Sequence, residues 1–476
     1  MDRFEDSAAA AHQDTIAAIS TPPGRGGIGI VRLSGPASAS IATRLVRLRQ
    51  PLEHARARLA DVVDEAGDEA DSTRIDEALV SFFATPKSYT AEDVVEIAAH
   101  GSPVVLEWLL RRALELGARL AEPGEFTQRA FVSGRLDLTQ AEAVRDLIDA
   151  QTLTQARQAA SQMGGALSRR VAPLKQSLVE LVALLEAGID FAEDDIDVTS
   201  QSRIAGQIEE IAGPLSALEA SFARGRIVHD GLTLAIVGRP NAGKSSLFNR
   251  LVERDRAIVT ATPGTTRDLV TERIALDGIP LELVDTAGLR GAAHGLVDEA
   301  EQLGIARSRE ALADAALVLI VLDATQPLNE EERLLFAAVE GRPALIALNK
   351  SDLKSGSASG QPSSEPDSPL PAAVSALPTS ALTGEGIPEL RARILALATG
   401  GAAAEAGMLT NLRQHRAVSA ALGALADAAR ANATSIPHEM ILLDLYRALW
   451  ALDSLTGQTT PDDILNLIFS TFCIGK

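Results

Sequence analysis

The spacing of apolar and polar residues gives the first part of the chain the pattern of a mixed α/β domain. Short apolar runs between turn-forming residues predict strands at residues 15–19, 29–33, 78–83 and 94–98. Apolar residues recur at helical spacing over residues 104–116, which predicts one helix there. We therefore expect an N-terminal α/β domain over residues 1–129.

Helical periodicity dominates two later stretches of the chain. Helices are expected over residues 136–150, 156–187 and 204–223, and again over residues 409–431 and 438–456. An acidic break at residues 191–197 interrupts the first group. Because the two groups flank a stretch of different character, we expect one discontinuous all-helical domain made of residues 130–228 and 400–476.

Residues 229–399, between the two helical groups, alternate short apolar strands with helices. Strands are expected at residues 232–237, 281–284, 317–322 and 344–348. This alternation is typical of βαβ units and a largely parallel sheet. A stretch rich in Ser, Pro and Gly, residues 354–371, predicts a flexible surface insertion. The expected architecture is multidomain α+β and α/β, with an α/β domain inserted into a helical one.

Composition narrows the class of protein. Hydrophobic residues form 46% of the 476 residues, enough for more than one core, and 23% charged residues exclude a largely disordered chain. The longest plain apolar run, residues 315–322, is too short to cross a bilayer. The acidic first residues do not fit a signal peptide. We expect a cytoplasmic protein that does not span a membrane.

Charge and cysteine content exclude further classes. The formal net charge of −20 leaves no global basic footprint, so any RNA would be bound by a local patch or with a basic partner. The single cysteine, Cys473, excludes an intrachain disulfide framework and a cysteine zinc site. It fits a reducing compartment.

A phosphate-binding motif follows the expected strand at residues 232–237. Residues 238–245 read Gly-Arg-Pro-Asn-Ala-Gly-Lys-Ser, which matches the G-x-x-x-x-G-K-[ST] pattern. The glycines let backbone N–H groups approach phosphate oxygens, while Lys244 reaches the β/γ-phosphates and Ser245 ligates Mg²⁺. A helical pattern from Ser246 onward supplies the structural context that the motif requires.

Two further motifs at strand ends specify guanine. Asp285 to Gly288 follow one strand, where the aspartate holds Mg²⁺ through water and the glycine senses the γ-phosphate. Asn349 to Asp352 follow another, and the Asp352 carboxylate accepts the N1–H and 2-amino groups of guanine, a donor pair that adenine lacks. Each motif alone is compatible with an Asx turn. Together and in this order they predict a Ras-like GTPase domain, similar to the translation-factor-related class, in which residues 380–382 pack against the guanine.

The expected catalytic apparatus differs from that of Ras. Leu289 stands where Ras-like enzymes carry the glutamine that orients the attacking water. Another group must orient that water, or the protein is a slow switch. Residues 260–268 form a threonine-rich switch I, in which Thr266 is the expected second Mg²⁺ ligand.

Several segments outside the GTPase domain carry a more specific resemblance. They are residues 21–35, 123–131 and 136–142 together with the terminal Phe-Cys-Ile-Gly-Lys of residues 472–476. With the inserted GTPase domain, they resemble the MnmE (TrmE) family of tRNA modification GTPases over nearly the whole chain. The resemblance implies an N-terminal domain that binds folate and dimerises. It also implies a homodimer that works with an FAD-containing partner, MnmG (GidA), in a heterotetramer or larger complex.

The reaction that the family implies is the addition of an aminomethyl or carboxymethylaminomethyl group to C5 of the tRNA wobble uridine, U34. The one-carbon unit would come from 5-formyl- or methylene-tetrahydrofolate. GTP hydrolysis would be stimulated by K⁺ and would need Mg²⁺. The resemblance thus predicts a GTP hydrolase that acts in tRNA modification.

Carried over residue by residue, the family's site residues fall into four groups. Folate would be bound by Arg32, Glu96, Arg135 and Lys476, and K⁺ by Asn241, Thr260, Thr262 and Thr265. GTP would contact Asn241, Ala242, Gly243, Lys244, Ser245, Ser246, Thr260, Ala261, Thr262, Pro263, Gly264, Thr265, Thr266, Asp285, Thr286, Ala287, Gly288, Asn349, Lys350, Asp352, Ser380, Ala381 and Leu382. The catalytic acid of the family aligns with Glu301, with Glu299 as the alternative.

Alternatives remain at this point. An Era-type GTPase switch in ribosome or RNA assembly would explain residues 229–399 but neither the N-terminal segment nor the tail. A folate-dependent one-carbon transferase with a regulatory GTPase domain is a third interpretation. Cys473 is either a catalytic thiol of the modification or a buried packing residue. The apolar residues 464–472 are expected to pack as a helix and so to fix the final residues.

Overall fold

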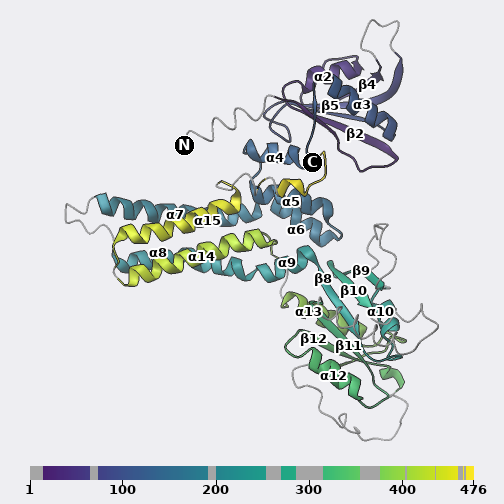
Figure 1. Ribbon diagram of the computed structural model, residues 1–476, viewed down its shortest axis with the longest axis vertical. Helices are drawn as coiled ribbons and strands as arrows, with labels where there is room; N and C mark the ends of the chain where they lie inside the picture. The colour runs from purple at the N-terminus through teal and green to yellow at the C-terminus, as the bar shows by residue number, and fades with distance from the viewer. Residues whose placement is uncertain are drawn as a thin grey trace, which may run out of the picture. The chain divides into compact units, whose positions relative to one another are not determined.

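A computed structural model describes most of the chain. The described residues are 14–64, 73–190, 200–252, 270–285, 315–353, 376–401, 405–434, 436–458, 465 and 468–475. The chain divides into two compact units, whose helices and strands are labelled in Figure 1. The first comprises residues 1–145, 162–204 and 423–476, and the second residues 146–161 and 205–422. Among the described residues, no helix combines the length and the apolar character that crossing a bilayer requires.

A seven-stranded sheet forms the core of the first unit, in the order β3-β4-β5-β6-β2-β1-β7. Its strands are β1 (Ile16–Ile19), β2 (Gly26–Ser34), β3 (Val46–Leu48), β4 (Arg56–Val63), β5 (Arg74–Phe83), β6 (Val94–Gly101) and β7 (Arg119–Leu120). Two helices, α2 (Ser38–Leu45) and α3 (Pro103–Glu115), pack their apolar residues into one core with Val31, Leu33 and Ile97. The four predicted strands and the predicted helix of this region are confirmed.

Three strands and a helix of this sheet region were not predicted, namely β3, β4, β7 and α2. Strand β4 reads Arg-Ala-Arg-Leu-Ala-Asp-Val-Val, and its first half is largely exposed. Charged residues on an exposed strand half hide the alternation that would reveal it. Strand β3 has only three residues, too few for any periodicity.

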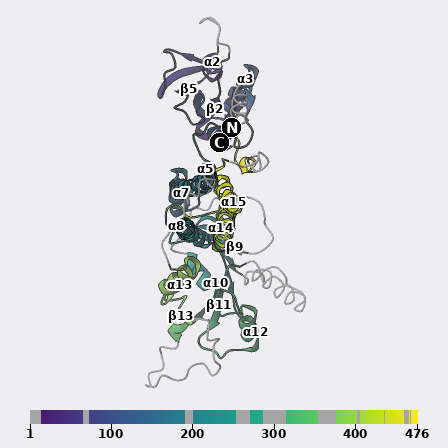
Figure 2. The ribbon, with the colours of Figure 1, turned by 90° about the vertical axis from the view of Figure 1, so that its left-hand side faces the viewer.

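The first unit contains two long helices that pack against each other. Helix α7 (Ala166–Asp190) and helix α15 (His438–Thr456) run side by side in Figures 1 and 2. Shorter helices, α4 (Glu125–Val132) and α5 (Leu138–Asp149), lie between the sheet and these helices along the chain. Helices α8 (Gln201–Ala220) and α14 (Leu412–Ala433) each contribute residues to both units.

The helical stretch predicted over residues 156–187 is wrong in one respect. The structure divides it into α6 (Leu153–Met163) and α7, which begins at Ala166. The break falls at two consecutive glycines, and Gly165 takes φ +79°, a left-handed conformation that an α-helix does not contain.

A six-stranded sheet forms the core of the second unit, in the order β13-β12-β11-β8-β10-β9. Five strands are parallel, and β9 runs antiparallel to β10 at the edge. The strands are β8 (Leu232–Val237), β9 (Val270–Leu276), β10 (Ile279–Asp285), β11 (Leu317–Asp323), β12 (Ala344–Asn349) and β13 (Ala376–Pro378). The four predicted strands are confirmed, whereas β9 and β13 were not predicted.

Helices cover both faces of this sheet. Alternate residues of β8 and β11 enter two separate apolar clusters, as period-two strands require. One cluster includes α10 (Lys244–Val252) and α13 (Ile387–Thr399), and the other includes α12 (Glu330–Ala338). The largely parallel sheet that the sequence predicted is thus confirmed, and the structure adds that helices cover both of its faces.

A short helical segment from before α7 belongs to the second unit. Thr152 donates from its hydroxyl to the carbonyl oxygen of Gly278 at 2.6 Å. Gln155 donates from its side-chain amide to the carbonyl oxygen of His229 at 2.7 Å, where α9 (Phe222–Asp230) ends. The imidazole of His229 lies 3.0 Å from a carboxylate oxygen of Asp146. These contacts fix the segment 146–161 at the start of β8.

Candidate functional site

The phosphate loop joins β8 to α10, and its backbone explains its glycines. Gly238 has φ +147°, and a Cβ there would clash with the carbonyl oxygen of Val321. Gly243 has φ +92°, and a Cβ there would clash with the side chain of Asn349. The Lys244 ammonium donates to the carbonyl oxygens of Gly238 and Arg239, at 2.7 and 2.9 Å. The loop thus curls around a lysine, as a phosphate site requires.

Asn349 joins this loop to the expected guanine loop. Its side-chain amide donates to the carbonyl oxygen of Ala242 at 2.9 Å, and its Oδ1 accepts from the N–H of Ala381 at 3.0 Å. Asn349 is 2% exposed, so both bonds are shielded from water. The structure therefore brings together the phosphate loop, the end of β12 and residues 380–382.

The rest of the guanine loop is held by short local contacts. Ser380 is buried, and its hydroxyl oxygen accepts from the N–H of Thr383 at 3.1 Å. Leu382 is 81% exposed, and its carbonyl oxygen accepts from Arg250 at 3.0 Å. Asp352 is half-buried in a single 3₁₀ turn, residues Ser351–Leu353, directly after β12. This loop presents apolar and carboxylate groups at one edge of the sheet.

Asp323 is a site residue that the sequence analysis missed. It ends β11 and is 5% exposed, and its carboxylate lies 2.7 Å from the Lys350 ammonium. Burial raises its pKa, but hydrogen bonds from Lys350 and Thr325 outweigh burial and bring the pKa down to about 2. The signal was present, since an aspartate ends an otherwise apolar strand beside β12.

Other predicted nucleotide residues are placed only in part. Ser245 and Ser246 lie in the first turn of α10. The backbone of Asp285 ends β10 and pairs with Ile236 of β8. The remaining expected residues lie outside the described part of the chain: Thr260, Ala261, Thr262, Pro263, Gly264, Thr265, Thr266, Thr286, Ala287, Gly288, Leu289, Glu299 and Glu301. The predicted insertion, residues 354–371, lies outside it as well.

A second candidate site surrounds Arg32 in the first unit. Arg32 of β2 and Glu96 of β6 are cross-strand partners, and their side chains meet at 2.7 Å. The guanidinium also lies over the rings of Tyr89 and Phe126, 5.7 and 5.6 Å from their centroids. Two rings and a carboxylate therefore fix the orientation of one cation.

Arg135 lies close enough to this site to act on it electrostatically. Burial raises the pKa of Tyr89, whereas a hydrogen bond with Thr127 and the charges of Arg32 and Arg135 oppose that rise. Arg135 itself is exposed and follows α4. Of the four predicted folate residues, Arg32 and Glu96 are in direct contact, the charge of Arg135 acts on Tyr89 beside them, and Lys476 lies outside the described residues.

The C-terminal tail docks beside Arg32. The carbonyl oxygen of Gly475 accepts from the Ser20 hydroxyl at 3.0 Å and from Arg32 at 3.4 Å. Pro123 and Ile474 form a β-bridge, and the Gly124 N–H donates to the Cys473 carbonyl oxygen at 3.4 Å. These contacts bring the tail to the predicted folate residues.

The residues before the tail are packed as the sequence predicted. Leu465, Phe469 and Phe472 are buried in one cluster with Leu138 and Val144. The Cys473 thiol is free and exposed, so it is not a buried packing residue. The expected fixing of the final residues by an apolar stretch is thus confirmed for the described positions.

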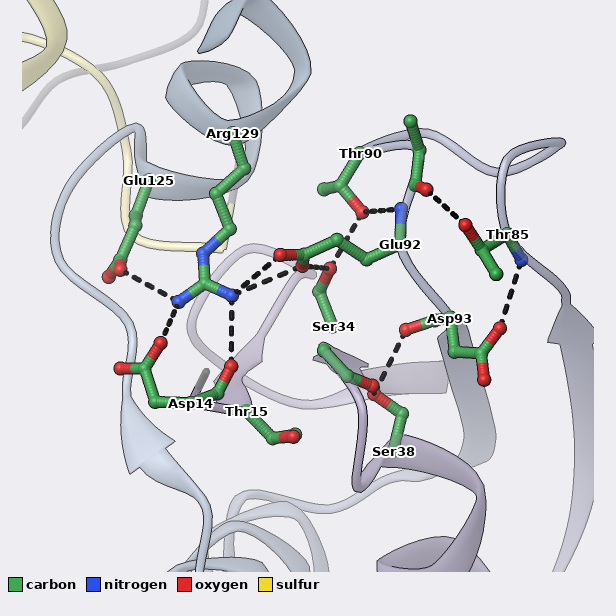
Figure 3. A network of polar contacts seen from close by, with 12 residues as sticks. Asp14, Thr15, Ser34, Ser38, Thr85, Thr90, Glu92, Asp93, Glu125 and Arg129 are labelled. Carbon is green, nitrogen blue, oxygen red and sulfur yellow. Dashed lines mark hydrogen bonds and ion pairs between the residues drawn. The ribbon is translucent and has the colours of Figure 1, made fainter. Parts of the chain in front are cut away.

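Figure 3 shows what holds the segment of residues 123–131 in place. Arg129 is 5% exposed and contacts the carboxylates of Asp14, Glu92 and Glu125, at 2.7, 3.1 and 3.3 Å. The hydroxyl of Ser34 donates to Glu92 at 2.6 Å. Burial raises the pKa of Glu125, but Arg119 and Arg129 outweigh it, so the pKa is lowered. Glu125 and Arg129 lie in a segment on which the resemblance rests, but neither was assigned a role from the sequence.

Comparison with known proteins covers both units. The family model "MnmE helical domain" matches residues 138–473, and "GTP-binding protein TrmE N-terminus" matches residues 15–135. A tRNA modification GTPase MnmE from Koribacter versatilis is 55% identical over 468 residues, covering 97% of this chain and 99% of its own. A protein of the same name from Chloroflexus aurantiacus is 42% identical over 470 residues, covering 97% and 100%. Another, from Geobacter sulfurreducens, is 40% identical over 469 residues, covering 98% and 99%.

Proposed function

The chain belongs to the MnmE family of tRNA modification GTPases, and we propose that its two candidate sites carry the two halves of one activity. The chain hydrolyses GTP in tRNA modification. In this proposal GTP is bound and hydrolysed at the end of β8, while the group transferred to the wobble uridine, U34, is prepared beside Arg32 and the tail. The chain works in the cytoplasm as a homodimer with an FAD-containing partner of the MnmG (GidA) type.

The observation that carries the GTP half is the double hydrogen bond of Asn349. It holds the phosphate loop beside residues 380–382, and this supports one guanine nucleotide contacting both loops. Lys244 then reaches the β/γ-phosphates, and Asp352 accepts from the guanine edge. Asp352→Asn tests this assignment, because an amide presents a donor where guanine also presents donors. Its affinity for GTP should fall while its affinity for xanthosine triphosphate rises.

The cations of the proposal match the donors present. Ser245 and Thr266 supply hydroxyl oxygens for Mg²⁺, and oxygen donors are the ligands that Mg²⁺ prefers. Asn241, in the phosphate loop at φ +65°, supplies an amide oxygen for K⁺ together with Thr260, Thr262 and Thr265. A bound K⁺ would supply positive charge beside the phosphates, where no arginine finger was found in the sequence. Glu301 would orient the attacking water.

The folate half rests on the docking of the tail. Arg32, Glu96, Arg135 and Lys476 offer cations and a carboxylate, which suit the carboxylates and the polar pteridine ring of a tetrahydrofolate. Arg32 is held by Glu96 and by the Gly475 carbonyl, so the tail and the folate residues would respond together. The exposed Cys473 thiol would then act in the modification of uridine C5.

Two competing functions make different predictions. An Era-type switch would need only residues 229–399, whereas the relatives match 97% of the chain. A one-carbon transferase with a regulatory GTPase domain would keep its chemistry without GTP hydrolysis. The experiment is complementation of a deletion strain, with wobble-uridine modification measured by mass spectrometry of tRNA. The native chain should restore modification, and Lys244→Ala and Arg32→Gln should each fail. Full restoration by Lys244→Ala would contradict the coupling to GTP.

A further inference from the structure

Arg145 of α5 holds the residues that immediately precede Cys473. Its Nη1 donates to the hydroxyl oxygen of Thr471 at 2.7 Å. Its guanidinium carbon also lies 6.0 Å from the centroid of the Phe472 ring. A guanidinium at that distance is attracted to an aromatic face. One side chain thus contacts two consecutive residues next to the thiol.

The residues that Arg145 contacts are themselves well packed. Phe472 is 6% exposed, its ring lies 5.5 Å from that of Phe469, and its N–H donates to the Phe469 carbonyl oxygen at 3.0 Å. The Thr471 hydroxyl donates to the carbonyl oxygen of Ile468 at 2.7 Å. Arg145 therefore acts on a turn with a defined shape and not on a loose chain end.

The other side of Cys473 is anchored independently. Its carbonyl oxygen accepts from the Gly124 N–H, and Ile474 bridges to Pro123. Gly475 follows, with its carbonyl oxygen held by Ser20 and Arg32. The exposed thiol thus lies between two anchored segments of the chain. Arg145 contacts the segment before the thiol, residues 471 and 472, through its side chain.

We infer that Arg145 is a positioning residue for the thiol of Cys473. It acts through Thr471 and Phe472, and its charge and hydrogen bond keep the turn before the thiol in one conformation. The inference rests on the proposed role of Cys473 in the modification. Without Arg145, the turn samples other conformations, and the thiol spends less time in the orientation that the reaction uses.

The next residue of the helix provides a matched control. Asp146 follows Arg145 directly, and its carboxylate contacts His229, which belongs to the second unit as Asp146 does. A change at Asp146 disturbs the same helix end without removing the Thr471 and Phe472 contacts. Asp146→Asn therefore separates a specific effect on the tail from a general effect on α5.

The first experiment uses the fact that Cys473 is the only cysteine of the chain. Alkylation of the full-length protein by iodoacetamide, followed by intact mass, reports on this thiol alone. Arg145→Gln should alkylate about 3- to 10-fold faster, the scale of losing one charge-assisted contact. Arg145→Lys, which keeps the charge and a donor, should stay near the native rate. Asp146→Asn should match the native rate.

The second experiment tests the route through Thr471. Thr471→Val removes the acceptor hydroxyl and keeps the volume, so it should accelerate alkylation as Arg145→Gln does. If both substitutions act through one contact, the double variant should be alkylated about as fast as either single variant. Any further increase in the rate should come only from the lost contact of Arg145 with Phe472. Fully additive effects of the two substitutions on the alkylation rate would mean that Arg145 does not act through Thr471, and would contradict this part of the inference.

The third experiment measures wobble-uridine modification with purified tRNA and the partner enzyme. Arg145→Gln should lower kcat about 3- to 10-fold and leave KM for tRNA unchanged, because positioning affects the reacting group and not tRNA binding. GTP hydrolysis should be unchanged, and Arg145→Lys should restore kcat. Native alkylation and native kcat in Arg145→Gln would overturn the inference. If Cys473→Ser retained full modification, the proposed role of the thiol would fail, whereas the alkylation result would still report whether Arg145 holds the tail.

Discussion

The guanidinium of Arg32 and the carbonyl oxygen of Gly475 lie 3.4 Å apart, although 443 positions separate the two residues in the chain. The same guanidinium is fixed by Glu96 and by two aromatic rings. A docked tail and an oriented cation thus form one arrangement in the first unit. Any change that moves the tail is expected to affect the predicted folate residues, and any change at those residues is expected to affect the docking of the tail.

Gly475 provides a direct test of tail docking. It has φ +92°, and a Cβ there would lie 2.6 Å from the carbonyl oxygen of Ile19. Gly475→Ala should therefore displace the tail and lower wobble-uridine modification at least about tenfold, the scale of 1.4 kcal/mol. GTP hydrolysis should be unchanged, because its residues lie in the second unit.

The matched control for that variant is Gly117→Ala. Gly117 also has positive φ, +106°, but a Cβ there meets nothing within 4 Å. It therefore carries the backbone strain without the clash. Equal losses of modification in the two variants would mean that general destabilisation, and not the tail, is responsible.

Asn241 tests the proposed K⁺ site. GTP hydrolysis should rise when Na⁺ is replaced by K⁺ at constant ionic strength, and this rise should vanish in Asn241→Ala and Asn241→Gly. Asn241 has φ +65°, where Ala costs about 1–2 kcal/mol and Gly costs little. The melting temperature should therefore fall only in the Ala variant. Unchanged K⁺ stimulation in both variants would refute the assignment of Asn241 as a ligand.

How far sequence predicts this fold depends on how locally each element is encoded. Strand β11 is a continuous apolar run buried along its whole length, and the phosphate loop is eight consecutive residues, so both were predicted. Strand β4 was not predicted, because its charged and exposed half conceals the alternation. The break before α7 was not predicted either. It depends on the left-handed conformation of Gly165, and two consecutive glycines allow that conformation without requiring it.

The same distinction holds for the sites. Asn349 and Lys350 were predicted from a local motif, but their partners Ala242 and Asp323 come from other strands and loops. The Arg129 network joins carboxylates from residues 14, 92 and 125, which no local pattern connects. Pairing of this kind follows from sheet topology and register, and it becomes visible only once the strands are placed.

Glu301 is the proposed group that orients the attacking water. Leu289 cannot do so, and a carboxylate after switch II is the candidate that the family resemblance supplies. Glu301→Ala should lower kcat for GTP hydrolysis about 10²-fold, the scale of a positioned general base, with little change in GTP affinity. Single-turnover hydrolysis and nucleotide titration measure the two quantities. A larger loss of kcat in Glu299→Ala would move the assignment to that residue.

His229 predicts how the stability of the second unit depends on pH. Hydrogen bonding to Asp146, with a smaller contribution from Asp230, raises its pKa from 6.5 to about 9 in spite of burial. A raised pKa means that the charged imidazole stabilises the folded state below about pH 6.5, and that this stabilisation is lost as pH rises through 9. The shift sets an upper bound of about 3 kcal/mol on the effect.

The urea midpoint of the native chain should therefore fall between pH 7 and pH 9.5, and the fall should be much smaller in His229→Gln. His100→Gln is the control, because that imidazole contacts Asp76 but is 73% exposed at its side chain, so water screens the interaction. Since β8 begins three residues after His229, the same pH range should weaken the attachment of segment 146–161 to the start of the nucleotide-binding sheet. Hydrogen exchange at the amides of residues 152–156 would report that loosening directly. Rates are first corrected for the pH dependence of intrinsic exchange. Protection that then stays constant from pH 7 to pH 9.5 would show that the ion pair between His229 and Asp146 does not hold this segment.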